Sequence, residues 1–156
     1  MNSVEVGKKV PEFSALATSD INFKLSDFKN KYILLYFYPR DNTSGCTQEG
    51  KDFRDSYARF QNKNIDIFGI SRDGIKAHEN FKAKHEFPFE LISDKDEVIC
   101  KLFDVIKEKK MYGKTHMGIE RSTFLIDKSG ILIKQWRKVK VKEHLQQVLD
   151  EIENLS

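Results

Sequence analysis

One cysteine lies where a thiol could react as a nucleophile. Cys46 follows a polar loop, residues 40–45, that leaves a strongly apolar segment and leads into a helical pattern. The backbone N–H groups of a first helical turn lack partners within the helix, and together with the helix dipole they favour an anion there. Thr43 or Ser44 is expected to cap this helix, which places Cys46 in its first turn. A thiol at this place is expected to carry more of the nucleophilic thiolate at neutral pH.

The residues that follow Cys46 recur at helical spacing. Intervals of four and three residues place five of them on one face of a helix: Cys46, Gly50, Phe53, Tyr57 and Phe60. Three aromatic side chains indicate that this face packs on the core. Cys46 is therefore expected to point inward, into a pocket, with Gly50 leaving space beneath it. A buried cysteine is also commonly an inert small apolar residue, and the spacing by itself leaves both interpretations open.

The elements that must position this thiol follow from the apolar patterns around it. Residues 32–38 are continuously apolar and aromatic, which is typical of a strand buried on both faces. Pro39 ends this strand, because proline cannot continue a central strand. The remaining expected elements are a hairpin of 13–17 and 21–24, a helix at 46–61, a strand at 65–70, a helix at 75–85, a short helix at 96–103, hairpin strands at 122–126 and 131–136 joined by residues 127–130, and an amphipathic helix at 141–155.

The order of these elements indicates an α/β protein. Two buried strands alternate with helices, and an antiparallel hairpin with a final helix follows them. This order predicts a mixed central sheet with helices on both faces and an N-terminal hairpin, which is the arrangement of a thioredoxin-like fold. The 156 residues contain no repeat or linker-like tract, so we expect a single domain, 1–156.

The composition argues against several other classes of protein. Hydrophobic residues make up 39% and charged residues 33%, which is typical of a soluble globular protein. The longest apolar run has seven residues, too short to cross a membrane. Residues 1–7 lack the basic and apolar regions of a secretory signal. Two cysteines 54 residues apart do not suggest a disulfide scaffold, so we expect a reducing, cytoplasmic location. We separately expect a monomer, with a dimer as the alternative.

Charge is unevenly distributed although the net charge is only +3. Residues 105–142 contain eleven Lys or Arg and three Asp or Glu. A nucleic-acid surface is one interpretation of this stretch, but no nucleic-acid-binding motif accompanies the charge. A solvated face that attracts an acidic partner protein is the preferred interpretation, and we expect neither nucleic-acid nor membrane binding.

The loop before Cys46 resembles a known active-site pattern. Residues 39–46 resemble the peroxiredoxin pattern Pro-x-x-x-Thr-x-x-Cys, and residues 36–55 are similar to its bacterioferritin-comigratory or Q-type branch. The likeness continues at residues 69–71, 87–89, 91–94, 121–127 and 136–141. It implies a thiol peroxidase that reduces hydrogen peroxide and organic hydroperoxides without a cofactor or metal. A thioredoxin-like protein or a small thiol would be the reductant.

The resemblance also implies roles for individual residues. Cys46 matches the cysteine that attacks the peroxide and becomes a sulfenic acid, and Arg121 matches the guanidinium that holds its thiolate anionic and donates to the peroxide. Thr43 matches a threonine that bonds the thiolate or peroxide; its simpler role is to cap the helix, and one hydroxyl can do both. Pro39 is implied to shield the thiolate, or merely ends the strand. Glu49 fits a supporting position across the loop.

Two positions depart from the pattern. Ser44 stands where this branch commonly has proline, and Lys51 stands where many members have a resolving cysteine, so the usual short disulfide cannot form. Cys100 is the remaining thiol, at the edge of a buried stripe in the helix expected at 96–103. It is interpreted first as structural, with an intramolecular resolving cysteine and an intermolecular partner as alternatives. The default is therefore a one-cysteine cycle with an external thiol.

Other chemistries fit the sequence less well. A thiol–disulfide oxidoreductase would need a second cysteine at Glu49. His78 and His85 lie seven residues apart without further ligands at zinc spacing, so they are interpreted as surface or core histidines. A hydrolase would need a histidine base beside Cys46, which nothing in the sequence supplies. A redox sensor that passes its oxidation to a partner would use the same Cys46, and only turnover with a reductant separates it from a peroxidase.

Overall fold

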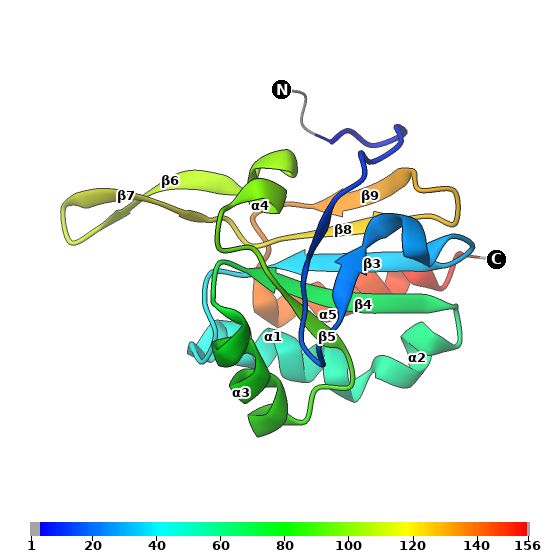
Figure 1. Cartoon of the computed structure of the whole chain (residues 1–156), viewed down its shortest axis with the longest axis horizontal. Coiled ribbons are helices and arrows are strands. Elements are labelled where there is room, and N and C mark those ends of the chain that lie inside the picture. The colour runs from blue at the N-terminus through cyan, green and yellow to red at the C-terminus, as the bar shows by residue number, and fades with distance from the viewer. Residues whose placement is uncertain (1–3, 156) are drawn as a thin grey trace.

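A computed structural model describes residues 4–155, and Figure 1 shows the arrangement of its elements. The expected domain, 1–156, therefore extends beyond this range at both ends. The segment that was expected not to be a secretory signal, residues 1–7, also begins outside it. The strands are β1 (Ser14–Leu16), β2 (Asn22–Lys24), β3 (Tyr32–Phe37), β4 (Ile65–Ser71), β5 (Glu90–Ser93), β6 (Ile106–Met111), β7 (Lys114–Ile119), β8 (Ser122–Ile126) and β9 (Leu132–Trp136). The helices are η1 (Leu25–Phe28), α1 (Ser44–Asp55), α2 (Tyr57–Gln61), α3 (Ile75–His85), α4 (Val98–Leu102) and α5 (Val141–Ile152).

A five-stranded mixed sheet with the order β5-β4-β3-β8-β9 forms the centre of the molecule. β3, β4 and β5 are parallel, whereas β8 runs antiparallel to β3 and β9 antiparallel to β8. β1 and β2 form the expected N-terminal hairpin as a separate two-stranded sheet. The predicted mixed sheet and hairpin are therefore confirmed.

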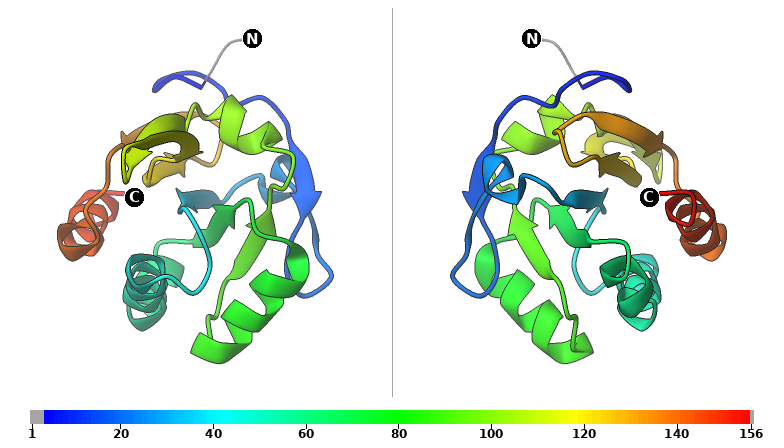
Figure 2. Two further views of the ribbon diagram at one scale, coloured as in Figure 1. Left: turned by 90° about the vertical axis from the view of Figure 1, so that its left-hand side faces the viewer. Right: turned by 90° about the vertical axis from the view of Figure 1, so that its right-hand side faces the viewer.

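The sheet separates two hydrophobic cores, which explains why β3 has no polar side. Ile33, Leu35 and Phe37 face one core, and the intervening Leu34 and Tyr36 face the other. Helices α1, α2, α3 and α5 cover the second core, while the N-terminal segment, the β1–β2 hairpin and α4 cover the first (Figures 1 and 2). Helices thus lie on both faces, as predicted.

The strand register brings the start of β8 to the end of β3. Phe37 pairs with Ile70 on one side and with Ser122 on the other. Because β8 runs antiparallel to β3, Arg121 just before it lies close to the loop that follows β3. Residues 75 positions apart in the chain thereby reach the same end of the sheet.

Several elements differ from the sequence-based expectation. The helix expected at 46–61 is interrupted at Ser56, and the last helix ends at Ile152 rather than Leu155. β5 was not predicted because its four residues follow directly on the phenylalanine-rich 87–89 segment. The β6–β7 hairpin was not predicted because polar residues make up most of both strands, which therefore lack the regular alternation of apolar residues that predicts a strand.

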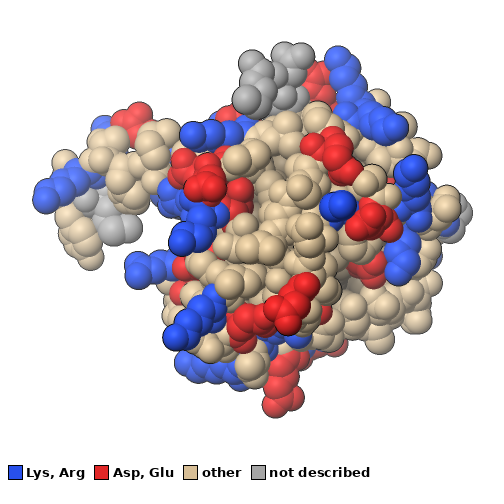
Figure 3. Space-filling view, in the orientation of Figure 1, with Lys and Arg blue, Asp and Glu red and all other residues tan. Residues whose placement is uncertain are grey.

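The β6–β7 ribbon extends away from the body of the protein (Figure 1). Lys and Arg side chains gather over the ribbon and along the adjoining left-hand side of the molecule in Figure 3. Tyr112 at its tip is 96% exposed. The basic stretch recognised in the sequence is thus in part an exposed ribbon. Within residues 4–155, no helix has the length and apolar character needed to cross a membrane.

Candidate active site

Cys46 is the third residue of α1 and points into the core, as its spacing predicted. It is 1% exposed and belongs to the same buried cluster as Tyr36, Phe53 and Phe87. A Cβ atom placed on Gly50 would lie 2.4 Å from the Phe87 ring, so this ring fills the space that Gly50 was expected to leave open. The thiol therefore lies in a packed core rather than above an empty space.

Thr43 occupies the N-cap position of α1, but its hydroxyl does not act as the cap that was expected. The hydroxyl donates to the carbonyl oxygen of Arg40 at 2.9 Å, while Ser44 forms the first residue of the helix. Because a hydroxyl has one hydrogen to donate, Thr43 is left with acceptor capacity only. The N–H groups of the first turn, including that of Cys46, remain directed at the start of the helix.

Arg121 joins the two side chains of the site that can carry negative charge. Its Nη1 donates to Glu49 Oε1 at 2.7 Å, and its Nη2 donates to Cys46 Sγ at 3.5 Å. The guanidinium also packs on Gly45, where a Cβ atom would come within 3.2 Å of Nη2. The planar fork of arginine allows both contacts at once, which a lysine could not reproduce.

Glu49 is a buried acid, 2% exposed, one helical turn after Cys46. Burial raises its pKa to about 7, although the Arg121 guanidinium opposes this shift. Its second carboxylate oxygen, Oε2, has no hydrogen-bond partner among residues 4–155. Glu49 can therefore gain or lose a proton near neutral pH, and the charge beside Arg121 changes when it does.

Pro39 follows the end of β3 and is partly buried, at the start of the loop that ends at Cys46. Its position agrees with the strand-ending role; the implied shielding of the thiolate stays a prediction. Pro39, Thr43, Glu49 and Arg121 all lie on the loop, the first turns of α1, or the segment before β8, around Cys46. The residues predicted for the site are therefore grouped at one end of the sheet.

The site also contains groups that the sequence did not reveal. Asp41 in the active-site loop forms a buried contact with His78 of α3. His78 is therefore a core histidine, which is one of the two interpretations, surface or core, given by the sequence. No spacing rule connects Asp41 to His78, because the contact depends on how α3 packs beside the loop.

Cys100 lies on the opposite face of the sheet from Cys46. It is fully buried in the first core, whereas Cys46 lies in the second. Burial and the nearby Asp94 carboxylate raise the pKa of the Cys100 thiol. The sequence placed Cys100 at the edge of a buried stripe; it lies instead inside the core, with the sheet between it and Cys46.

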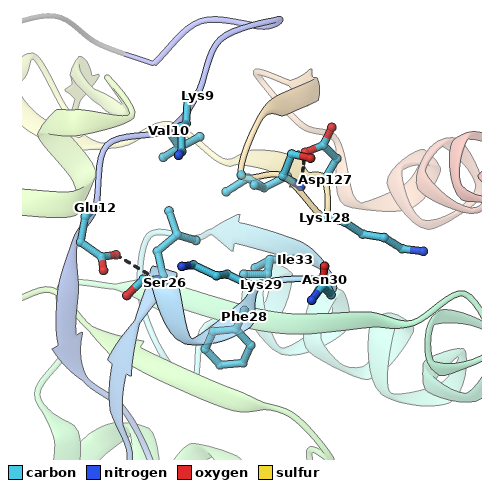
Figure 4. Close-up of a pocket in the computed structure, with 14 residues that line it drawn as sticks. Lys9, Val10, Glu12, Ser26, Phe28, Lys29, Asn30, Ile33, Asp127 and Lys128 are labelled. Atoms are coloured by element: carbon cyan, nitrogen blue, oxygen red, sulfur yellow. Dashed lines mark hydrogen bonds between the residues drawn. The ribbon is translucent and has the colours of Figure 1, made fainter.

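Two hollows in the described part of the protein lie near the two ends of β3. One, of about 510 Å³, is lined by residues beside the first turn of α1 and the start of α5: Ser44, Gly45, Gln48, Asp52, Val141 and Lys142. The other, of about 460 Å³, lies at the far end of β3 among Lys9, Lys29 and Asp127 (Figure 4). Cys46 lines neither of them, and only the first adjoins its helix.

Known proteins resemble this chain over nearly its full length. The AhpC/TSA family matches residues 6–135. Peroxiredoxin Bcp of Bacillus subtilis (strain 168) is 49% identical over 154 residues, which is 99% of this chain and 98% of the relative. A mutant of Xylella fastidiosa PrxQ has a TM-score of 0.91 at 39% identity, covering 98% of each chain. A structure of the Xanthomonas campestris bacterioferritin comigratory protein, studied for its alkyl peroxide reduction activity, has a TM-score of 0.86 at 44% identity over 90% of each chain.

Proposed function

The chain belongs to the AhpC/TSA family and is a peroxiredoxin with the expected thioredoxin-like fold, and we propose that Cys46 is the thiol with which it attacks hydroperoxides. The observation that supports this assignment is the Arg121 guanidinium, which contacts Cys46 Sγ at 3.5 Å at the start of a helix. The positive charge and the free N–H groups of the first turn both stabilise a thiolate. Among residues 4–155, no Lys or Arg side chain is hydrogen-bonded to Cys100 Sγ, and the N–H group of Cys100 already donates to Asp94.

The reaction requires a thiolate and a stabilised leaving group. The Cys46 thiolate attacks the peroxide oxygen that carries hydrogen, so an S–O bond forms while the O–O bond breaks. Cys46 becomes a sulfenic acid, and the other oxygen leaves as hydroxide or alkoxide, which takes up a proton to give water or an alcohol. Arg121 stabilises the charge that moves onto this oxygen, and the Thr43 hydroxyl accepts a hydrogen bond from the peroxide.

Regeneration then uses external thiols. One thiol condenses with the sulfenic acid, releasing water and leaving a mixed disulfide, and a second thiolate displaces Cys46 from it. A thioredoxin-like dithiol or a small thiol can supply both equivalents. We propose that Cys100 takes no part, because a disulfide needs Cα atoms within about 7 Å and the two cysteines belong to cores on opposite faces of the sheet.

The substrate class follows from the setting of the thiol. Cys46 is packed among aromatic side chains, including Tyr36 and Phe53, and is 1% exposed, so the peroxide reaches it after these side chains move. An apolar surrounding of this kind accepts the alkyl part of an organic hydroperoxide. We propose alkyl hydroperoxides as substrates together with hydrogen peroxide, in line with the activity described for the Xanthomonas campestris relative.

The test is to find where the first oxidation occurs. The reduced protein receives one equivalent of cumene hydroperoxide in the presence of dimedone, and digested peptides are analysed by mass spectrometry. The expected product is a dimedone adduct on Cys46, with Cys100 as free thiol. An adduct on Cys100, or an oxidised protein that dithiothreitol cannot return to further turnover, would contradict the proposal.

A further inference from the structure

We infer that Asp41 and His78 are positioning residues for the peroxidase reaction, which hold the loop that carries Thr43 and leads to Cys46 onto α3 and β5. The loop between β3 and α1 has no regular structure of its own, and Asn42 within it has a left-handed backbone with φ of +62°. Such a segment is held in one conformation by tertiary contacts. The contacts of Asp41, five residues before Cys46, supply them. The inference rests on the proposed role of Cys46.

The side chain of Asp41 is held from two directions. The Tyr38 hydroxyl donates to Oδ1 at 2.7 Å, and His78 Nδ1 lies 2.7 Å from Oδ2. The side chains of His78 and Asp41 are 0% and 3% exposed. Hydrogen bonds between groups shielded from water are costly to break, because each partner is left unsatisfied.

The far side of the imidazole fixes where its hydrogens lie. His78 Nε2 is 2.9 Å from the carbonyl oxygen of Ile92, and because a carbonyl can only accept, Nε2 must carry a hydrogen and donate it. One further hydrogen then lies between Nδ1 and the Asp41 carboxylate. The ring therefore connects the active-site loop to β5 through a continuous chain of hydrogen bonds, and removing either Asp41 or His78 breaks it.

The backbone of the loop is held at the same residue. The Asp41 N–H donates to Asp73 Oδ2 at 2.9 Å, and the Ser71 hydroxyl donates to the same oxygen at 2.5 Å. Ser71 ends β4, so this second connection joins the loop to the strand beside β3. The loop is thus bound through both the main chain and the side chain of Asp41, whereas the hydroxyl of Thr43, two residues later, contacts only the loop itself.

A cation site is the alternative use of these groups. Asp41, Asp73 and His78 place ligand atoms within 4.8 Å of one another. However, Nδ1 and Oδ2 are in direct hydrogen-bond contact, and the Ile92 carbonyl occupies Nε2. A metal would need atoms that already bind each other, so the geometry is that of a hydrogen-bonded tether.

The test compares variants that break the tether with one that preserves it. Asp41→Ala and His78→Phe remove the connection between loop and ring. Asp41→Asn keeps it, because the amide oxygen accepts from Tyr38 and the amide nitrogen donates to Nδ1 of a neutral His78. His144→Phe is the matched control: His144 is another buried histidine, on α5, and the substitution removes its 2.7 Å contact with Thr123 of β8. If Asp41→Ala does not fold, Tyr38→Phe removes one of the two bonds to Asp41 at nearly constant volume.

The readout is the rate of Cys46 sulfenic acid formation in folded protein, measured by rapid quench with dimedone and compared with the free energy of unfolding. We expect Asp41→Ala and His78→Phe to slow attack by on the order of 10- to 100-fold, because misplacement of about 1 Å has such an effect. Tyr38→Phe should lie between these variants and wild type. Asp41→Asn should recover to within about threefold of wild type, and His144→Phe should lose stability without slowing attack.

The inference is wrong if Cys46 is oxidised at the wild-type rate in both Asp41→Ala and His78→Phe. It is also wrong if Cys46 oxidation in Asp41→Asn is as slow as in Asp41→Ala. Wild-type protein and Cys46→Ser run in parallel separate this failure from that of the proposed function. If wild-type Cys46 forms no adduct, the proposed function is wrong; if it does and the variants match it, only the positioning role is wrong.

Discussion

Cys46 and Cys100 occupy equivalent places in two helices on opposite faces of one sheet. Each is the third residue of its helix and each is at most 1% exposed. The starts of the helices differ. In α4 the Asp94 carboxylate accepts from the N–H groups of Ile99 at 3.1 Å and Cys100 at 2.7 Å. In α1 the N-cap hydroxyl of Thr43 is turned to Arg40 instead.

This difference shows that a helix start does not by itself make a thiol reactive. The carboxylate that accepts from the first turn of α4 also places a negative charge beside Cys100, and burial together with this charge raises the pKa of that thiol. At α1 the Arg121 guanidinium contacts the thiol instead, and its positive charge favours the anion. With equal burial and equal helical position, the two thiols thus differ in the sign of the charged side chain beside them.

The largest expected effect comes from replacing each of the two cysteines by serine in turn. Cys46→Ser should remove all hydroperoxide reduction with dithiothreitol as reductant, because serine supplies no thiolate. Cys100→Ser should keep most of the activity, because its thiol lies across the sheet in the other core. The measurement is peroxide consumption under excess reductant. Turnover by Cys46→Ser would assign the chemistry to the other face.

A disulfide between Cys46 and Cys100 would give both cysteines a role in the cycle. To test for it, the same proteins are run on non-reducing gels after treatment with peroxide. We expect neither a faster-migrating monomer nor a stoichiometric dimer in wild type. A quantitative Cys46–Cys100 bridge, accompanied by loss of thioredoxin-dependent turnover in Cys100→Ser, would make Cys100 a resolving cysteine and require the sheet or its helices to open during each cycle.

The second effect tests the charge that distinguishes Cys46. Arg121→Gln should slow sulfenic acid formation by roughly 10²- to 10³-fold, the typical result of removing one donor that stabilises a developing anion. Arg121→Lys should recover only part of this loss, since one ammonium group cannot reproduce the contacts of Nη1 and Nη2. Stopped-flow measurement at a pH high enough to ionise Cys46 fully in both proteins separates the rate of attack from the ionisation of the thiol. If Arg121→Gln reacts at the wild-type rate at that pH, the only role of Arg121 is to favour ionisation of Cys46.

The sequence predicted the elements around Cys46, and the resemblance implied Arg121 as its partner, but neither indicated the Asp94 carboxylate beside Cys100. Strand β3 was predicted because all its side chains are apolar, and the start of α1 because a polar loop precedes helical spacing. Asp41 and His78 were not connected, since their contact depends on the tertiary position of α3. The Thr43 hydroxyl was expected to cap α1, because a local sequence rule does not reveal that the Arg40 carbonyl competes for its hydrogen.

The third effect concerns the acid beside Cys46. The pKa of Glu49 is raised to about 7 in the folded state, from a usual value of 4.5. Between these values the folded protein keeps a proton that the unfolded chain releases, so this contribution to stability is present below 4.5 and is lost as the pH rises to about 7. The loss amounts to about 3 kcal/mol. Denaturant unfolding at about pH 5 and about pH 8 measures most of this loss, because the unfolded carboxyl is already largely ionised at pH 5.

Glu49→Gln removes this titration and keeps an oxygen for Arg121. Its free energy of unfolding should therefore change less between the two pH values than that of wild type. An unchanged pH dependence in Glu49→Gln would show that the carboxyl titrates at its ordinary value in spite of its burial. Asp94, the acid beside Cys100, offers the matched comparison: it is held by two backbone N–H groups, and Asp94→Asn should weaken α4 instead.

The smallest effect is expected for Cys100→Ala. It is an effect on stability, and it tests whether Cys100 contributes only to packing. Cys100→Ala removes one buried atom from the core formed with Ile99 and Phe103, and the loss of one methylene-sized group costs about 1 kcal/mol. The backbone N–H that donates to Asp94 is retained. Unfolding in urea should therefore show a lower midpoint with an unchanged slope, while the rate of Cys46 oxidation stays at the wild-type value. A slower Cys46 oxidation at full stability would contradict this separation, because it would couple the two cores through the sheet.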